Sequence, residues 1–170
     1  KLNAPADFET QQTYSVRVKG TDPGGLGVEK AYTITVNDIN EVPTELNIDK
    51  NTIPENEPAG TVIGNLSTAD PDAGDTHVFA LTDDVEQHPD NAAFTVEGIQ
   101  LKAAEPFDFE SKSTYNIELK VTDADGLVLA KGLSILVTDI NEVPTSIILD
   151  NENIDENKVG GLSFMLTGKL

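Results

Sequence analysis

The chain has 170 residues, enough for one to two ordinary domains, and its 38% apolar and 24% charged residues suit a folded protein. Thirty acidic residues against eleven basic ones give a net charge of −19, which repels nucleic acid and anionic lipid and attracts cations. The absence of cysteine excludes disulfides, zinc–thiolate sites and thiol catalysis. No apolar run approaches the ~18 residues of a membrane-spanning helix, so we expect no direct membrane insertion.

The organisation of the chain is set by an internal repeat. The segment DINEVPT occurs at residues 38–44 and again at 139–145, so a shift of 101 positions aligns the chain with itself. The same shift places the DFE of residues 7–9 on the DFE of residues 108–110. Such a period indicates a tandem array of domains of about a hundred residues each.

This period divides the chain into three parts. We expect residues 1–43 to be the C-terminal part of one repeat, residues 44–144 a complete repeat, and residues 145–170 the N-terminal part of a third. The chain begins with Lys1 and shows no signal-peptide pattern. We therefore interpret it as a piece of a longer protein whose export is directed by sequence outside it.

Within the complete repeat, the apolar pattern is typical of β-strands. Short apolar runs occur at residues 62–66, 78–81 and 94–96, and residues 115–121 and 133–137 alternate apolar with polar side chains. Turn signals containing proline and glycine separate these runs, and no useful stretch has a helical period. About seven short strands in such a repeat predict an all-β, antiparallel sandwich.

The acidic residues gather in loops, at strand ends and in the segment between repeats. In chain order the clusters are Asp7 with Glu9, then Asp38 with Asn40 and Glu41, then Asp70 with Asp72, and then Asp123. Calcium takes about six to eight oxygen ligands, which several loops meeting at a junction can supply. Carboxylates ~4 Å apart repel by about 4 kcal/mol at an effective dielectric near 20. Bound divalent ions would remove that repulsion.

Five short motifs occupy these loops and strand ends. They are PEN at 54–56, DPD at 70–72, FDFE at 107–110, VTDADG at 121–126 and DINEVP at 139–144. In this order they resemble the motifs of tandem cadherin repeats, of the bacterial kind found in large exported adhesins, and the resemblance covers essentially the whole chain. It implies tandem Ig-like antiparallel β-sandwich repeats of the cadherin type, with partial repeats at both ends.

The resemblance also implies calcium ligands at two junctions. At the first junction they are Asp7, Glu9, Asp38, Asn40, Glu41, Asp70, Asp72 and Asp123, with the carbonyl groups of Ile39 and Val42. At the second they are Glu55, Asp108, Glu110, Asp139, Asn141 and Glu142, with the carbonyl group of Ile140. We expect one ion between Asn40, Asp70, Asp72 and Asp123, and one or two ions at the second junction.

Two departures from the family's linker motif bear on these sites. Glu41 and Glu142 stand where the family has aspartate, and the extra methylene of each shifts its carboxylate. Val42 and Val143 stand where the family has asparagine, a mild change because the family uses the backbone oxygen there.

The function that this resemblance implies is structural. We expect a calcium-binding adhesion repeat, extracellular or at the cell surface, in which ions at the junctions stiffen an extended array. The expected cofactor is Ca2+ and the expected partners are neighbouring repeats. Other copies of the chain, through strand or half-domain complementation, and surface polysaccharide are further candidates. A calcium-dependent carbohydrate-binding module is the alternative function.

Other interpretations are weaker. Residues 70–75 resemble half an EF-hand, but the glycine falls one place early and the closing glutamate is missing. His77 and His88 have no ligand spacing, so we expect both to face solvent. Tyr14 and Tyr115 occupy equivalent strand positions and are expected in the core. Each acidic cluster has a place in the calcium pattern and no catalytic motif is present, so we expect no enzyme.

Overall fold

The structure is a computed structural model that describes residues 4–84, 86–144, 146–149 and 164–167. Its strands are β1 (Thr13–Thr21), β2 (Gly27–Thr35), β3 (Glu45–Ile48), β4 (Thr52–Pro54), β5 (Val62–Ala69), β6 (Val78–Leu81), β7 (Phe94–Glu97), β8 (Gln100–Ala103), β9 (Thr114–Thr122), β10 (Val128–Thr138), β11 (Ser146–Leu149) and β12 (Phe164–Thr167). A short 3-10 helix, η1 (Pro89–Ala93), lies between β6 and β7. Among the described residues no helix is long and apolar enough to cross a membrane.

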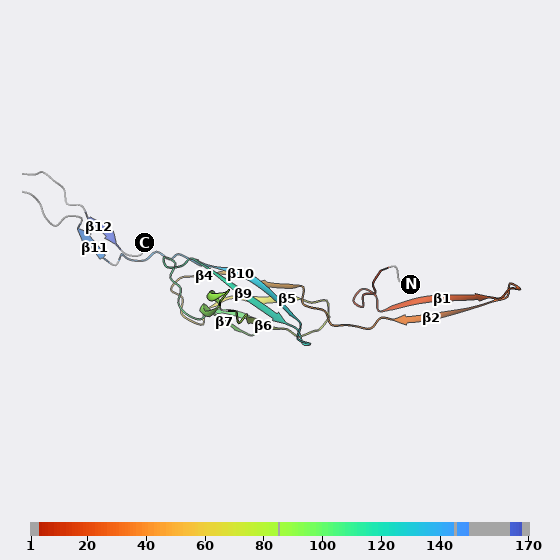
Figure 1. The fold of residues 1–170 in the computed structure, drawn as a ribbon. Coiled ribbons are helices and arrows are strands. Elements are labelled where there is room, and N and C mark those ends of the chain that lie inside the picture. Colours follow the sequence, from red (N-terminus) through yellow and green to blue (C-terminus); the bar gives the residue numbers. More distant parts are fainter. Residues whose placement is uncertain (1–3, 85, 145, 150–163, 168–170) are drawn as a thin grey trace, which may run out of the picture.

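Strands β3 to β10 form a sandwich of two four-stranded sheets (Figure 1). One sheet has the strand order β4-β10-β9-β6 and the other has the order β3-β5-β8-β7. The neighbouring strands run antiparallel, except that β4 pairs in parallel with the end of β10. The predicted all-β sandwich is therefore confirmed, with one parallel pair that the sequence pattern did not indicate.

The hydrophobic core lies between these sheets, and β9 shows how the sequence builds it. Ile117, Leu119 and Val121 alternate with more exposed residues, and all three are at most 1% exposed. Because successive side chains of a strand point to opposite faces, this alternation directs one apolar row into the core. The other members of this core among the described residues are Leu46, Ile53, Ile63, Leu66, Ala93, Phe94, Leu101, Ala103, Phe107, Ile135 and Val137.

An aromatic cluster closes one part of this core. The ring centroids of Phe94 and Phe107 lie 5.3 Å apart, and that of Tyr115 lies 4.7 Å from Phe107 and 5.7 Å from Phe94. Offset and edge-on ring pairs at these distances contribute about 0.5–1.5 kcal/mol each beyond their buried area. The expected core position of Tyr115 is confirmed.

Some short elements were not singled out by the sequence pattern. Strands β3, β4 and β8 have three or four residues each, too few for alternation to be recognised. The 3-10 helix η1 carries Asn91, which is buried. The Asn91 side chain donates to the carbonyl oxygen of Thr82 over 2.9 Å and accepts from the N–H of Glu118 over 3.0 Å. Asn91 thus joins η1 to β9 by satisfied polar contacts.

The hairpin of β1 and β2 repeats the register of the hairpin of β9 and β10. Its pairs run from Thr13 opposite Thr35 to Thr21 opposite Gly27, and each pair recurs 101 positions later in β9 and β10. The internal repeat of the sequence is therefore also a repeat of strand pairing.

The turns of the two hairpins are built alike. Asp22 accepts a hydrogen bond from the N–H of Leu26 over 2.8 Å, and Asp123 accepts one from the N–H of Leu127 over 2.8 Å. The glycine within each turn, Gly25 or Gly126, has a positive φ that disfavours other residues. The shared TD…GL pattern of the sequence thus specifies one turn geometry twice.

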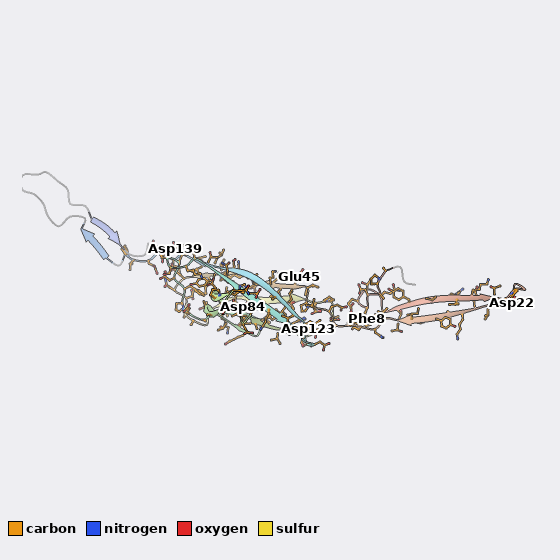
Figure 2. All side chains as sticks on the ribbon, viewed as in Figure 1. Phe8, Asp22, Glu45, Asp84, Asp123 and Asp139 are labelled. Carbon is orange, nitrogen blue, oxygen red and sulfur yellow. The ribbon has the colours of Figure 1, made fainter. Side chains whose placement is uncertain are left out.

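The two hairpins outside the sandwich lie at its opposite ends (Figure 1). Phe8, which precedes β1, lies near the end of the β1–β2 hairpin that faces the sandwich, and Asp22 lies near the far tip (Figure 2). Most of residues 145–170, the predicted third part, lie outside the described residues. The division into partial and complete repeats stays a prediction.

Candidate metal centres

The first group of carboxylates lies where the connector after β2 meets the sandwich. One oxygen each of Glu9, Asp38, Glu41 and Asp72 lies within 4.8 Å of the others. Asp72 belongs to the loop between β5 and β6, and its carboxylate accepts a hydrogen bond from the N–H of Glu41 over 2.8 Å. We call these four residues the first carboxylate cluster.

Desolvation and like charges oppose the ionisation of two glutamates of this cluster, Glu41 and Glu9. Desolvation and the neighbouring carboxylates of Glu9 and Asp72 raise the pKa of Glu41. A hydrogen bond from its own backbone lowers the pKa of Glu9, but desolvation and the charge of Asp38 outweigh it, so the net shift is upward. A cation bound among these carboxylates would favour the ionised form of each.

Asn40 and Asp123 lie beside the first carboxylate cluster. The amide of Asn40 donates to Asp123 over 2.8 Å. Desolvation opposes the ionisation of Asp123, but the hydrogen bonds from Asn40 and from the N–H of Leu127 outweigh it and lower the pKa. Asp123 is therefore held as a carboxylate at the end of the sandwich that faces the β1–β2 hairpin (Figure 2).

The second group of carboxylates lies at the opposite end of the sandwich. One oxygen each of Glu55, Glu110 and Glu142 lies within 4.8 Å of the others, and we call these residues the second carboxylate cluster. Glu55 is fully buried, and its two oxygens accept hydrogen bonds of 2.9 Å from the N–H groups of Phe109 and Ile140. Glu55 therefore joins the loop before β9 to the connector after β10.

Glu142 contributes a buried oxygen to the second carboxylate cluster. Its Oε1 accepts a hydrogen bond of 2.7 Å from Asn56, whereas its Oε2 is buried and has no hydrogen-bond partner in the described part of the chain. A buried charged acceptor without a partner is costly and calls for an unseen water or ion. The second carboxylate cluster therefore fits a hard cation with oxygen ligands such as calcium.

Asp70, a predicted ligand of the first junction, lies beside a histidine. Its carboxylate is 2.7 Å from Nε2 of His77, and Asp75 completes a group of three whose ligand atoms lie within 4.8 Å of one another. The expectation that His77 faces solvent is wrong, since its side chain is only 15% exposed. His88 lies at the surface, partly exposed and 3.5 Å from Glu118.

Asp75 was missed by sequence reasoning. It lies in the same loop as Asp70 and Asp72, and it lines a surface hollow together with Asp38 and Asp125. The signal that would have found it is its position five residues after Asp70 across a glycine-containing turn.

The other predicted ligands lie outside these groups. Asp7 accepts hydrogen bonds from the N–H and the hydroxyl of Thr10, over 3.1 and 2.8 Å. Asp108 accepts one from the N–H of Ser111 over 3.2 Å. The other predicted ligands outside the three groups are Ile39, Val42, Asp139, Ile140 and Asn141, and Ile140 contributes its N–H to Glu55. The full ligand sets stay predictions.

Comparison with known proteins places the chain in a family. A model of the cadherin domain matches residues 50–137, so the chain belongs to the cadherin domain family. The chain is 34% identical to human protocadherin gamma-A1 over 150 residues, and this alignment covers 81% of this chain and 15% of that protein. The chain is 27% identical to human protocadherin gamma-C4 over 175 residues, and this alignment covers 95% of this chain and 18% of that protein. The chain thus spans less than a fifth of these relatives.

Solved structures show the same fold. The extracellular cadherin domains 3-6 of protocadherin gamma B2 match 93% of this chain and 40% of theirs, with a TM-score of 0.64 at 21% identity. The EC1-2 structure of human protocadherin-24 matches 82% and 72%, with a TM-score of 0.65 at 23% identity. Cadherin domains as a family bind calcium and serve in adhesion rather than catalysis. The narrower expectation of a bacterial adhesin stays a prediction.

Proposed function

We propose that this chain is a calcium-binding segment of an extracellular cadherin array, in which ions at the ends of the sandwich stiffen the connections to its neighbours. The observation that carries the proposal is the buried, unpartnered Oε2 of Glu142 beside Glu55 and Glu110. The first carboxylate cluster at the other end supports it, because desolvation and the neighbouring carboxylates raise the pKa of its Glu41.

The residues of the chain already tie each connector to the sandwich. Glu41 donates its N–H to Asp72 at one end, and Glu55 accepts the N–H of Ile140 at the other. Calcium, when bound, supplies the positive charge that these carboxylates lack. A connector held in this way has fewer orientations relative to the sandwich, so the array becomes more rigid.

The expected strength of binding sets where the array would be rigid. Extracellular calcium modules bind with dissociation constants of about 10⁻⁴–10⁻³ M, so external calcium fills them and cytosolic calcium does not. An ion at ~100 times its dissociation constant stabilises the folded state by about 2.7 kcal/mol per site. Ionic occupancy therefore contributes a large part of the ~5–15 kcal/mol stability of a typical domain.

Calorimetric titration of the chelator-stripped chain with calcium tests this function. We expect at least two ions to bind, Asp72→Asn to weaken only the site of the first cluster, and Glu142→Gln to weaken only that of the second. Glu105→Gln is the matched control, because Glu105 is exposed and belongs to neither cluster. Absence of binding in millimolar calcium would refute the proposal.

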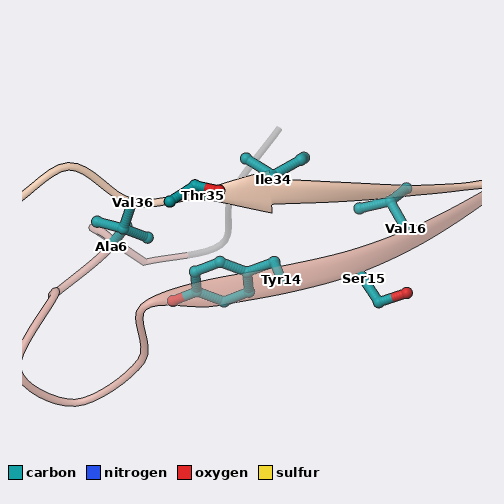
Figure 3. Close-up of a pocket in the computed structure, with 7 residues that line it drawn as sticks. All are labelled: Ala6, Tyr14, Ser15, Val16, Ile34, Thr35 and Val36. Carbon is teal, nitrogen blue, oxygen red and sulfur yellow. The ribbon is translucent and has the colours of Figure 1, made fainter.

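The β1–β2 hairpin supports a second part of the proposal, which concerns the partner. Val16, Val18 and Ile34 are 40–52% exposed, whereas the residues 101 positions later are buried beneath the other sheet. Tyr14, Val16, Ile34 and Val36 line an apolar pocket on this hairpin (Figure 3). In this proposal another half-repeat, with strands like β3, β5 and β8, covers this apolar face. That half-repeat belongs either to a neighbouring part of the same array or to a second copy of this chain.

Analytical ultracentrifugation over a range of concentrations, with calcium, tests whether a second copy is the source of that half-repeat. Self-association that Val18→Asp abolishes would support a second copy. A strictly monomeric chain would contradict it and leave neighbouring repeats of the same array as the partner.

A further inference from the structure

Among the described strands, β4 and β10 form the one parallel pair, and this pair closes one edge of the sandwich. The three residues of β4 lie opposite residues 136–138 of β10. Asn51 and Glu55, on either side of β4, extend the pairing, and we call β4 with these two residues and residues 136–138 the parallel clamp. We infer that the parallel clamp resists force applied along the length of the chain. This inference goes beyond the proposed stiffening of the junctions, because it concerns the sandwich and needs no ion.

Asn51, directly before β4, contacts β10 twice. Its carbonyl oxygen accepts the N–H of Leu136 over 2.9 Å. Its side-chain amide donates to the carbonyl oxygen of Ser134 over 2.9 Å. The second bond reaches two residues beyond the paired part of β10, so the side chain lengthens a pairing that would otherwise span three residues. Alanine at this position would keep the first bond and lose the second.

Glu55, directly after β4, extends the pairing at its other end. Its N–H donates to the carbonyl oxygen of Thr138 over 3.0 Å, and its Oε1 accepts the N–H of Ile140 over 2.9 Å. Glu55 is fully buried. Hydrogen bonds in such a low-dielectric environment are electrostatically stronger than bonds in water. Both ends of β4 are therefore fastened to β10 or to the connector that follows it.

The direction of the strands determines how tension acts on these bonds. The connector from the β1–β2 hairpin enters the sandwich at one end, and the connector after β10 leaves it at the other (Figure 1). Because β4 and β10 run parallel, tension pulls β4 toward the first of these ends and β10 toward the second. The strands must slide past each other, so the hydrogen bonds between them are strained together. Bonds that are pulled apart from one end break in turn, at lower force.

Single-molecule pulling of the full chain tests the inference. The chain has no cysteine, so introduced cysteines can serve as the attachment points. Asn37→Cys with Val143→Cys places one point in each connector and pulls the sandwich lengthwise. Ala59→Cys with Val143→Cys places both points at the end where β4 finishes, and pulls across the sandwich. All three positions are exposed. Measurements in chelator remove any contribution from bound ions.

We expect unfolding in chelator to need a higher force lengthwise than across. Forced unfolding is governed by the unfolding rate. Asn51→Ala should raise the lengthwise unfolding rate by roughly fivefold, as expected for the loss of one strained hydrogen bond, and should change the rate across the sandwich little. Asn51 is exposed, so the variant should fold.

Asn116→Ala is the matched control. The side chain of Asn116 also contacts Ser134, since it accepts the Ser134 hydroxyl over 2.8 Å, but it belongs to β9. Its bond joins β9 to β10 and lies outside the parallel clamp. We expect this variant to leave the difference between the two pulling directions unchanged, whereas Asn51→Ala should reduce it.

Two results would overturn the inference. One is an equal unfolding force in the two directions in chelator. The other is an equal effect of Asn51→Ala and Asn116→Ala on lengthwise unfolding, which would make the bond from Asn51 to Ser134 an ordinary structural contact. A failure of calcium to bind would refute the proposed function and would leave the results in chelator unaffected.

Discussion

Replacing Glu55 by glutamine separates the structural part of the second carboxylate cluster from its ionic part. Glu55 is fully buried, and its two oxygens accept N–H groups from two different segments. Glutamine has the same shape but keeps only one acceptor oxygen, so its NH2 group faces one N–H donor at the position of the lost oxygen. The substitution also removes one negative charge from the cluster.

The structure sets the size of the effect. Hydrogen bonds to charged groups contribute about 1.5–3 kcal/mol each, and Glu55→Gln removes one and weakens the other by removing its charge. We therefore expect the free energy of unfolding to fall by about 2–3 kcal/mol in the absence of calcium. For a domain of about a hundred residues this lowers the melting temperature by roughly 10 °C or more.

The assay is thermal unfolding with chelator and again with calcium. The parent chain should gain stability from calcium, and Glu55→Gln should gain markedly less, in addition to its lower melting temperature in chelator. Glu105→Gln, at an exposed position, controls for the loss of one charge. The reasoning is refuted if Glu55→Gln melts with the parent chain in chelator, because the two backbone contacts of Glu55 would then contribute nothing.

Three further predictions concern the sandwich itself. Leu119→Ala empties a fully buried site and should cost about 2–5 kcal/mol of unfolding free energy in chemical denaturation. Gly64→Ala should cost about 1–3 kcal/mol, because a methyl group there collides with the carbonyl oxygen of Lys50. Burial raises the pKa of Asp90, but its hydrogen bonds, foremost that with Lys112, outweigh burial and lower it below 3.8. The ionised Asp90 carboxylate therefore stabilises the fold fully above pH 3.8, and this stabilisation disappears as the pH falls through the lowered pKa. Asp90→Asn should lower the free energy of unfolding by about 1 kcal/mol at pH 7 and by little near pH 2.

Each of these predictions has a clear contrary result. Leu136→Ala, at a 41% exposed position on β10, is the control for Leu119→Ala, and equal losses in the two variants would contradict the assigned core. Unchanged stability of Gly64→Ala would show that the chain relaxes around the methyl group. If Asp90→Asn lowered the free energy of unfolding equally at every pH, the charge of Asp90 would not be the source of its stabilising effect.

The sequence predicts those parts of the fold that depend on local pattern. Residues 115–121 and 133–137 alternate over enough positions for a strand period to be read, and they lie within β9 and β10. The recurring turn with Gly25 or Gly126 follows from a backbone conformation that few residues other than glycine adopt. The internal period of 101 residues predicts equal pairing in the two hairpins, which the structure shows.

The grouping of the candidate ligands was predictable only in part. Glu55, Glu110 and Glu142 come from three segments that local pattern cannot place together, and only the resemblance to a family joined them. The contact between Asp70 and His77 was not predicted, because it depends on the turn at Gly74, which returns the chain so that His77 reaches Asp70. Sequence spacing alone does not show which way a loop folds back.

Comparison of the β1–β2 hairpin with the β9–β10 hairpin separates what the sequence determines from what the tertiary structure decides. Val16, Val18 and Ile34 alternate along their strands just as Ile117, Leu119 and Ile135 do, and the register of pairing is the same. The first three are largely exposed and the last three are buried. Alternation determines which face of a hairpin is apolar, because successive side chains of a strand point to opposite faces. Burial of that face is decided by the second sheet, β3-β5-β8-β7, which lies over β9 and β10.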